Sequence, residues 1–140
     1  LVVQLGSAVR YMNKMGIVNN SISPDSIYIS IINGKPYLKI VDYSYSTITC
    51  HNSKINIAGD IEYSTYTAMD NYQFRSDLLG YGIISYYIIT GNLPLNLHEN
   101  TSNFILRNSI KRIDFSSKFW EKEEILRNTV RGSLMYALGH

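Results

Sequence analysis

Hydrophobic residues at the start of the chain recur at the spacing of a helix, as the apolar positions Leu1, Leu5, Ala8, Val9 and Met12 show. Most of the polar residues between them fall outside this stripe, which is typical of an amphipathic helix. The pattern predicts a helix over residues 1–15. Gly16 follows its last turn and is expected to end it, because glycine readily adopts the left-handed conformation found after helix ends.

Two short runs rich in β-branched and aromatic residues come next, at 27–31 and 37–41. Asn33 and Gly34 stand between them, a dipeptide that favours a tight hairpin turn. The segment 19–26 before the first run is polar and has little periodicity, so we expect a loop there.

The next segment, 42–74, is dominated by Ser, Thr, Tyr and Asn and predicts one long loop. Residues 77–90 are then apolar nearly all round, which is typical of a helix buried in the centre of a domain. Including the residues that lead into it, we expect this helix over 72–90. Gly91 is expected to end it and Pro94 to prevent its resumption.

The remaining residues predict a short helix at 103–108 and a last helix over about 119–138, capped by Ser117. The chain is therefore expected to form one mainly α domain, α+β overall, with a small β-hairpin. No internal repeat and no second domain is indicated.

Composition narrows the class of protein. The 140 residues are 45% hydrophobic and carry a net charge of +2, too small to favour nucleic acid or an anionic membrane as a partner. The pairs Lys111–Arg112 and Arg127 with Arg131 are interpreted as a solvated face. Cys50 is the sole cysteine, and the sequence shows no signal peptide or membrane span, so an intracellular protein, cytoplasmic or nuclear, is expected. The heavy use of Ile, Asn and Tyr fits AT-rich coding, as in a virus or a protist.

Six short motifs follow one another along the chain: Ala8–Val18, Asn19–Ser26, Lys39–Ser44, Ala58–Tyr63, Tyr72–Leu78 and Thr90–Pro94. Together they resemble the carboxyl-terminal lobe of protein kinases over nearly the whole chain, 1–140. In this comparison 19–26 matches the catalytic loop, Asp42 the Asp of the Asp-Phe-Gly metal motif, and 72–94 the buried central helix with Asp77 in its first turn. The amino-terminal lobe is absent, and residue 1 is Leu, so we expect a segment of a longer protein.

The segment that begins at Gly59 lacks Ala-Pro-Glu, and Gly59–Met69 is closer to the casein kinase I and vaccinia-related kinase group. That group includes poxvirus kinase-like proteins, so the resemblance implies a possible viral origin.

The positions that carry kinase chemistry have changed. The resemblance places Ser21 at the catalytic Asp, Ser23 at the loop Lys and Ser26 at the metal-binding Asn. A serine hydroxyl is a very poor base and a weak metal ligand, so the catalytic loop is degenerate. Asp42 alone remains as a candidate cofactor-binding and metal ligand.

Structural interpretations compete with these roles. Asp42 is also explained as a loop carboxylate that caps nearby backbone, and Asp77 as an acceptor of backbone N–H groups from the catalytic loop. The resemblance gives structural roles to Pro24, Gly59, Gly91 and Pro94 as well. Cys50 beside His51 lies in a polar loop and forms no positioned dyad, and His51, His98 and His140 lack partners at metal-ligand spacing.

Two functions from different classes follow. The first is a pseudokinase lobe, a non-catalytic module that binds a protein partner such as an active kinase or its substrate. The second is a fragment of a Ser/Thr protein kinase-like enzyme with residual ATP-dependent phosphotransfer. No cofactor is expected, and Mg-ATP is expected only if an amino-terminal lobe precedes this segment.

Overall fold

The amino-terminal helix α1 spans Val2–Lys14 in the computed structural model, which describes residues 1–48, 66–95 and 103–137. This confirms the helix predicted at 1–15. Its buried residues Leu5, Val9 and Met12 form the apolar stripe, and Gly16 ends it with a φ of 75°. That positive angle is the left-handed conformation expected of a residue after a helix.

The predicted hairpin is also present, as β2 (Ile27–Ile32) and β3 (Lys35–Ile40). Asn33 and Gly34 form the turn with φ angles of 50° and 75°, the two positive angles that a type I′ turn requires. The strands pair antiparallel with Ile29 opposite Leu38. A second small sheet joins β1 (Ile17–Val18) to β4 (Thr47–Ile48), also antiparallel.

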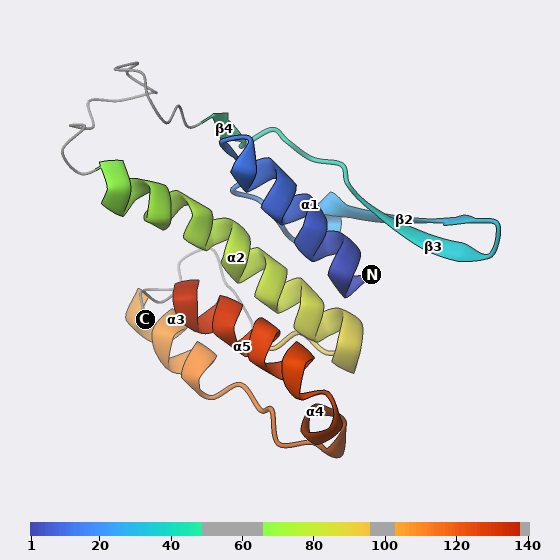
Figure 1. Ribbon diagram of the computed structural model, residues 1–140. Coiled ribbons are helices and arrows are strands. Elements are labelled where there is room, and N and C mark those ends of the chain that lie inside the picture. The colour runs from blue at the N-terminus through green and yellow to red at the C-terminus, as the bar shows by residue number, and fades with distance from the viewer. Residues whose placement is uncertain (49–65, 96–102, 138–140) are drawn as a thin grey trace.

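A side chain from α1 holds the hairpin at its outer edge. The Gln4 amide donates to the Pro36 carbonyl at 3.0 Å and accepts from the Leu38 N–H at 2.8 Å. The base of the hairpin packs on α1 through Ile27, Leu38 and Ile40, while its tip projects away from the helices (Figure 1). The large apolar residues left exposed on the hairpin are Tyr28, Ile29, Ile31, Ile32 and Tyr37.

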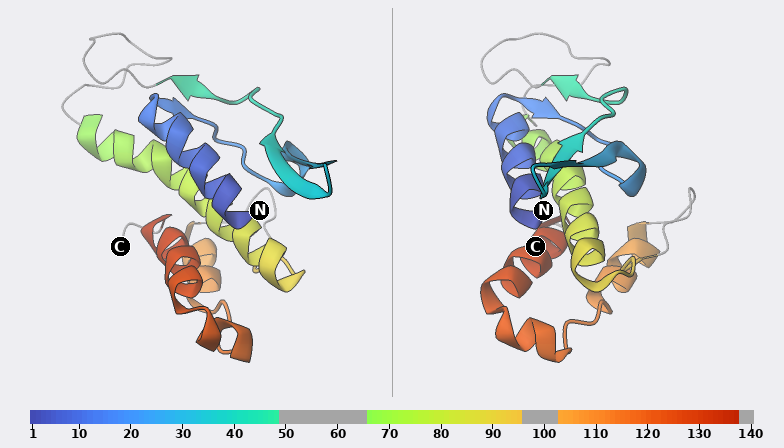
Figure 2. Two further views of the ribbon diagram at one scale, coloured as in Figure 1. Left: turned by 45° about the vertical axis from the view of Figure 1, so that its right-hand side comes forward. Right: turned by 90° about the vertical axis from the view of Figure 1, so that its right-hand side faces the viewer.

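The long helix α2 (Tyr66–Thr90) lies between the two halves of the fold, with α1 on one side and the carboxyl-terminal helices on the other (Figures 1 and 2). Each half has its own apolar cluster, and α2 contributes to both. Tyr81 and Ile84 join the α1 cluster with Leu5, Val9, Met12, Ile22 and Ile40. Ile83 joins the second with Leu95, Ile110, Trp120, Val130 and Leu134. The predicted burial of this helix is confirmed at Ile83 and Ile84, although Tyr87 is exposed.

Two glycines of α2 allow its neighbours to approach closely. A Cβ at Gly80 would lie 2.7 Å from the backbone oxygen of Ile22, and one at Gly82 would lie 2.7 Å from Leu134 Cγ. Both distances are too short for a real carbon contact. Gly80 thus brings the loop of residues 19–26 onto α2, and Gly82 brings the last helix onto its other side.

The carboxyl-terminal half consists of α3 (Asn103–Lys111), α4 (Lys118–Lys122) and α5 (Glu124–Ala137). The short helix predicted at 103–108 is confirmed and extends three residues further. The buried Trp120 stacks on Tyr86 of α2 with ring centroids 5.7 Å apart and meets Phe115 edge-on at 5.0 Å. This aromatic cluster fixes α4 against the end of α2.

The predicted long loop over 42–74 is wrong at both ends. Thr47–Ile48 form β4, and α2 begins at Tyr66 rather than at 72. Residues 66–74 mix polar residues with Tyr, Ala, Met and Phe, and this short mixed stretch was predicted as part of the preceding polar loop. Asp77 consequently lies well inside α2 and not in its first turn.

The single last helix predicted over 119–138 is also wrong, because Glu123 separates α4 from α5 with φ −111° and ψ 59°. A straight helix would place Trp120 and Leu134 about 21 Å apart along its axis. Their partners on α2, Tyr86 and Gly82, are only about 6 Å apart along that helix. The break lets both contacts form. Ser117 occupies the cap position of α4 as expected, but its side chain makes no capping hydrogen bond.

The architecture is thus a small α+β domain, mostly helical, with short antiparallel strands. This agrees with the predicted fold class at that level. Within the described ranges, no helix is long and apolar enough to cross a bilayer.

A pair of glycine substitutions tests the close approach at α2. Gly80→Ala is expected to destabilise the chain by about 1–3 kcal/mol, because the added methyl meets the backbone of Ile22. Gly132→Ala in α5 is the matched control, since a Cβ there meets nothing within 4 Å. It should stabilise the chain by about 0.5–1 kcal/mol through helix propensity. Urea unfolding measures both, and equal effects of the two substitutions would contradict the packing described.

Candidate functional site

The loop of residues 19–26 is held by one buried carboxylate of α2. Asp77 Oδ2 accepts the backbone N–H of Asn19 and Oδ1 accepts that of Asn20, each at 2.9 Å. The Asp77 side chain has no solvent exposure. These are the hydrogen bonds that the sequence predicted for Asp77, and they join residues 57 and 58 positions apart in the chain.

Burial and hydrogen bonding act on Asp77 in opposite directions. Removal from water raises its pKa above the ordinary value, while the two backbone N–H groups lower it, and burial has the larger effect. No cation pairs with this carboxylate among the residues that the structure describes. Within the described residues, the charge of Asp77 is therefore stabilised by the backbone N–H groups of Asn19 and Asn20.

Two asparagine side chains then connect the loop to the segment after β3. Asn19 Nδ2 donates to the Asp42 carbonyl at 2.8 Å, and its Oδ1 accepts from the Ser21 N–H at 3.0 Å. Asn20 Nδ2 donates to the Tyr45 carbonyl at 3.0 Å. Asn20 has a φ of 64°, a conformation that asparagine tolerates better than most residues.

Sequence reasoning missed these two asparagines, because it asked only which residues of 19–26 match the catalytic groups of kinases. The available signal was the Asn-Asn pair itself, since asparagine often bonds nearby backbone at turns.

One of the three serine hydroxyls that the resemblance places at catalytic positions forms hydrogen bonds within the loop. Pro24–Ser26 form a single 3₁₀ turn. Ser26 Oγ accepts from the Ser23 N–H and donates to the Ser23 carbonyl, both at 2.9 Å, and Ser26 is only 2% exposed. The Ser26 hydroxyl is therefore closed to a ligand in this conformation. Ser21 contributes its backbone N–H to the Asn19 side chain.

Asp42 lies in the segment that Asn19 holds. Its Oδ1 accepts the Ser44 N–H at 2.9 Å, and this hydrogen bond lowers the pKa of the carboxyl. The arrangement fits the capping interpretation of Asp42, while metal binding remains a prediction. In the described part of the chain, no group of three His, Cys, Asp or Glu side chains is placed to hold a metal ion.

The other sequence-predicted residues lie elsewhere. Gly91 ends α2 with a φ of 75°, and Pro94 follows it outside any helix. Gly59, Cys50 and the three histidines fall outside the described residues. Two large hollows, of about 770 and 700 Å³, are lined by other parts of the fold, and no residue of 19–44 lines either one.

Comparison with known proteins finds similarity over most of the chain. The cGMP-dependent protein kinase 2 of Homo sapiens is 27% identical over 139 residues, covering 95% of this chain and 18% of that kinase. Serine/threonine-protein kinase DCLK2 of Rattus norvegicus is 25% identical over 128 residues, covering 86% of this chain and 16% of its own length. The chain is distantly similar to Ser/Thr protein kinases.

A bacterial relative extends this similarity. Serine/threonine-protein kinase Pkn1 of Myxococcus xanthus is 29% identical over 103 residues, or 66% of this chain and 14% of that kinase. No protein-family model matches the chain. This kinase-related segment spans less than a fifth of the length of these relatives.

The buried carboxylate gives a testable prediction. Asp77→Asn places an amide N–H₂ against a backbone N–H and should lower the free energy of unfolding by about 1–3 kcal/mol at neutral pH. Asp25→Asn, an exposed carboxylate on the same loop, is the control and should have little effect. Urea unfolding of both variants measures the difference.

The difference in the free energy of unfolding between wild type and the Asp77→Asn variant should widen as pH falls. The folded pKa of Asp77 is raised, so the folded state binds this proton more tightly than the unfolded state. The resulting stability is complete below the unfolded pKa and is lost as pH rises through the folded pKa. Unfolding curves from pH 7 to 4 report the gap. A gap that shrinks toward acid would mean that the hydrogen bonds outweigh burial.

Proposed function

We propose that this chain is the carboxyl-terminal lobe of a protein kinase fold that has lost phosphotransfer and acts by binding a protein. The observation that carries the proposal is a loop held firmly by Asp77 whose three reactive positions, Ser21, Ser23 and Ser26, bear only hydroxyls. The frame that positions a catalytic loop is retained, while the groups that would react are replaced.

Phosphotransfer places demands that these residues do not meet. The substrate hydroxyl needs a carboxylate to accept its proton, and a cation must neutralise charge on the moving phosphoryl group. Ser21 and Ser23 supply neither. The Ser26 hydroxyl is bonded to the Ser23 backbone on both its donor and acceptor sides, so it would have to break these bonds to bind a metal.

Nucleotide binding is proposed to be absent from the chain by itself. Asp42 is the one carboxylate that the resemblance provides as a ligand to Mg²⁺, an ion that prefers octahedral oxygen coordination shared with phosphates. Mg-ATP binding would require an amino-terminal lobe to cover the adenine and phosphates. Residual transferase activity is the competing function, and it depends on Asp42 keeping its metal role.

The finer family assignment rests on sequence motifs. The segment Gly59–Met69 supports the casein kinase I and vaccinia-related kinase group, and the composition supports a viral source. We keep both as proposals, together with an intracellular location.

The proposed partner is a protein, either an active kinase or its substrate, and neither nucleic acid nor membrane. Its contact surface is proposed on the side of residues 42–74, next to 103–108. In the described part of this surface Tyr43 and Tyr45 are exposed, and exposed tyrosines provide large contact area with a hydrogen-bonding hydroxyl.

The lack of phosphotransfer is tested with radiolabelled ATP. Purified protein is expected to label neither itself nor casein, while an active casein-kinase-type enzyme assayed in parallel labels both. A mock preparation controls for contaminating kinases. Label that appears with wild type, disappears with Asp42→Ala and is absent from the mock preparation would overturn the proposal in favour of residual transfer.

Mg-ATP binding is tested by thermal unfolding. A ligand at 100 times its Kd would add about 2.7 kcal/mol and shift the melting temperature by several degrees. We expect no Mg²⁺-dependent shift with ATP. Asp42→Asn and the control Asp25→Asn separate a specific site from general charge effects. A shift that Asp42→Asn removes and Asp25→Asn leaves intact would reassign the chain as a nucleotide-binding module.

A further inference from the structure

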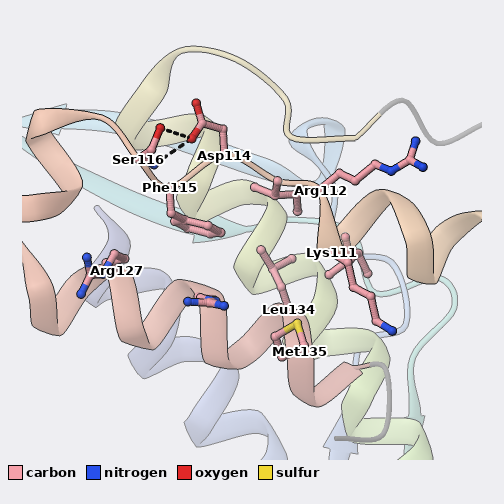
Figure 3. Close-up of a pocket in the computed structure, with 11 residues that line it drawn as sticks. Lys111, Arg112, Asp114, Phe115, Ser116, Arg127, Leu134 and Met135 are labelled. Carbon is pink, nitrogen blue, oxygen red and sulfur yellow. Dashed lines mark hydrogen bonds between the residues drawn. The ribbon is translucent and has the colours of Figure 1, made fainter.

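A hollow of about 700 Å³ lies between the end of α3, the segment leading to α4, and α5 (Figure 3). We call it the basic pocket, because Lys111, Arg112, Arg127 and Arg131 line it. These cations come from positions far apart in sequence, where they suggested only a solvated face. Folding brings them to one concavity of the size that binds ligands.

The cations stand at two ends of the basic pocket. Figure 3 shows Lys111 and Arg112 at one end and Arg127 at the other. Arg127 and Arg131 are four residues apart on α5, so they share one face of that helix. Their guanidinium groups are suited to bidentate contact with carboxylate or phosphate.

These charges have no internal partners in the described part of the chain. The side-chain hydrogen bonds within the pocket join Asp114 to Ser116 and involve none of the four cations. Glu123 and Glu124 lie one turn before Arg127, and neither lines the pocket. Arg127 is half-buried, and a partly desolvated cation without a carboxylate partner gains from an external anion.

The single carboxylate in the lining is already occupied. Asp114 Oδ1 accepts the Ser116 N–H at 2.7 Å and its hydroxyl at 2.6 Å, and these bonds lower the pKa of Asp114. Asp114 therefore stays ionised and repels an anion at its own side. The anionic groups of a ligand are expected at the two cationic ends instead.

Between those ends part of the lining is apolar. Met135 of α5 lies in the middle of the pocket with Phe115 close by, and both are partly exposed, whereas the neighbouring Leu134 is buried (Figure 3). Methionine adapts its shape to varied apolar groups. An inorganic anion would leave this surface unused, whereas a ligand with a central apolar group and anions on both sides would fill it.

We propose that the basic pocket binds an acidic peptide segment in which a large apolar side chain is flanked by carboxylate or phosphate groups. The pocket favours an extended chain over a membrane, because cations around a hollow cannot all reach a flat bilayer. It disfavours nucleic acid, because its centre is apolar and the net charge is only +2. None of the residues that line this pocket belongs to 42–74 or 103–108, and the site does not depend on catalytic status.

The probe for this site is a fluorescein-labelled peptide with a central Phe flanked on each side by two Glu, and fluorescence anisotropy measures its binding to the chain. Arg127→Gln with Arg131→Gln should weaken binding at least about tenfold. The control is Arg10→Gln with Lys14→Gln, which has the same four-residue spacing on α1 and the same charge change. It should change the affinity less than about twofold.

Further peptides separate the sources of affinity. Replacing the central Phe by Ala should also weaken binding about tenfold, and phosphoserine in place of Glu should bind at least as tightly. The proposal is overturned if the α1 control loses as much affinity as the α5 variant, because binding would then follow net charge alone. It is equally overturned if the peptide does not bind. Phosphatidylserine vesicles are tested in the same way. If wild type binds the vesicles but not the peptide, and the α5 variant does not bind the vesicles, the pocket would be assigned to a membrane.

Discussion

The buried carboxylate of Asp77 is the interaction on which the site depends. It accepts the N–H groups of two successive loop residues, so it fixes the position and direction of the backbone as it leaves β1. Asn19 and Asn20 can then direct their side chains to the segment 42–47. One carboxylate thus orders two loops, although it is buried without a counter-ion in the described structure. Because the acceptor is provided by a helix, the position of both loops depends on the position of α2.

The position of α2 makes this arrangement costly to change. Its residues contribute to both apolar clusters, and its glycines admit the loop on one side and α5 on the other. A shift of α2 that relieved one contact would disturb the other. The packing that holds the loop is therefore linked to the packing that forms the basic pocket.

Much of the fold could be predicted from local patterns. The stripe of α1, the Asn33–Gly34 turn and the all-apolar centre of α2 each follow from spacing or turn chemistry within a few residues. The errors arose where tertiary contacts decide. Stacking of Trp120 on Tyr86 divides the last helix, and residues 66–74, a mixture of polar and apolar residues, continue α2. The roles of Asn19 and Asn20, and the gathering of four cations around one pocket, join distant segments and leave no local signal.

The Gln4 amide has a consequence for how copies of the chain can associate. A hairpin with exposed isoleucines normally offers two free edges to further strands, which is a route to aggregation. Gln4 bonds the outward-facing groups of Pro36 and Leu38, and Pro36 itself has no N–H to donate. The β3 edge is thereby closed to an incoming strand. A strand from another copy of the chain can then add only at the edge of β2. A single glutamine in the first turn of α1 thus decides which edge of the hairpin is open to association.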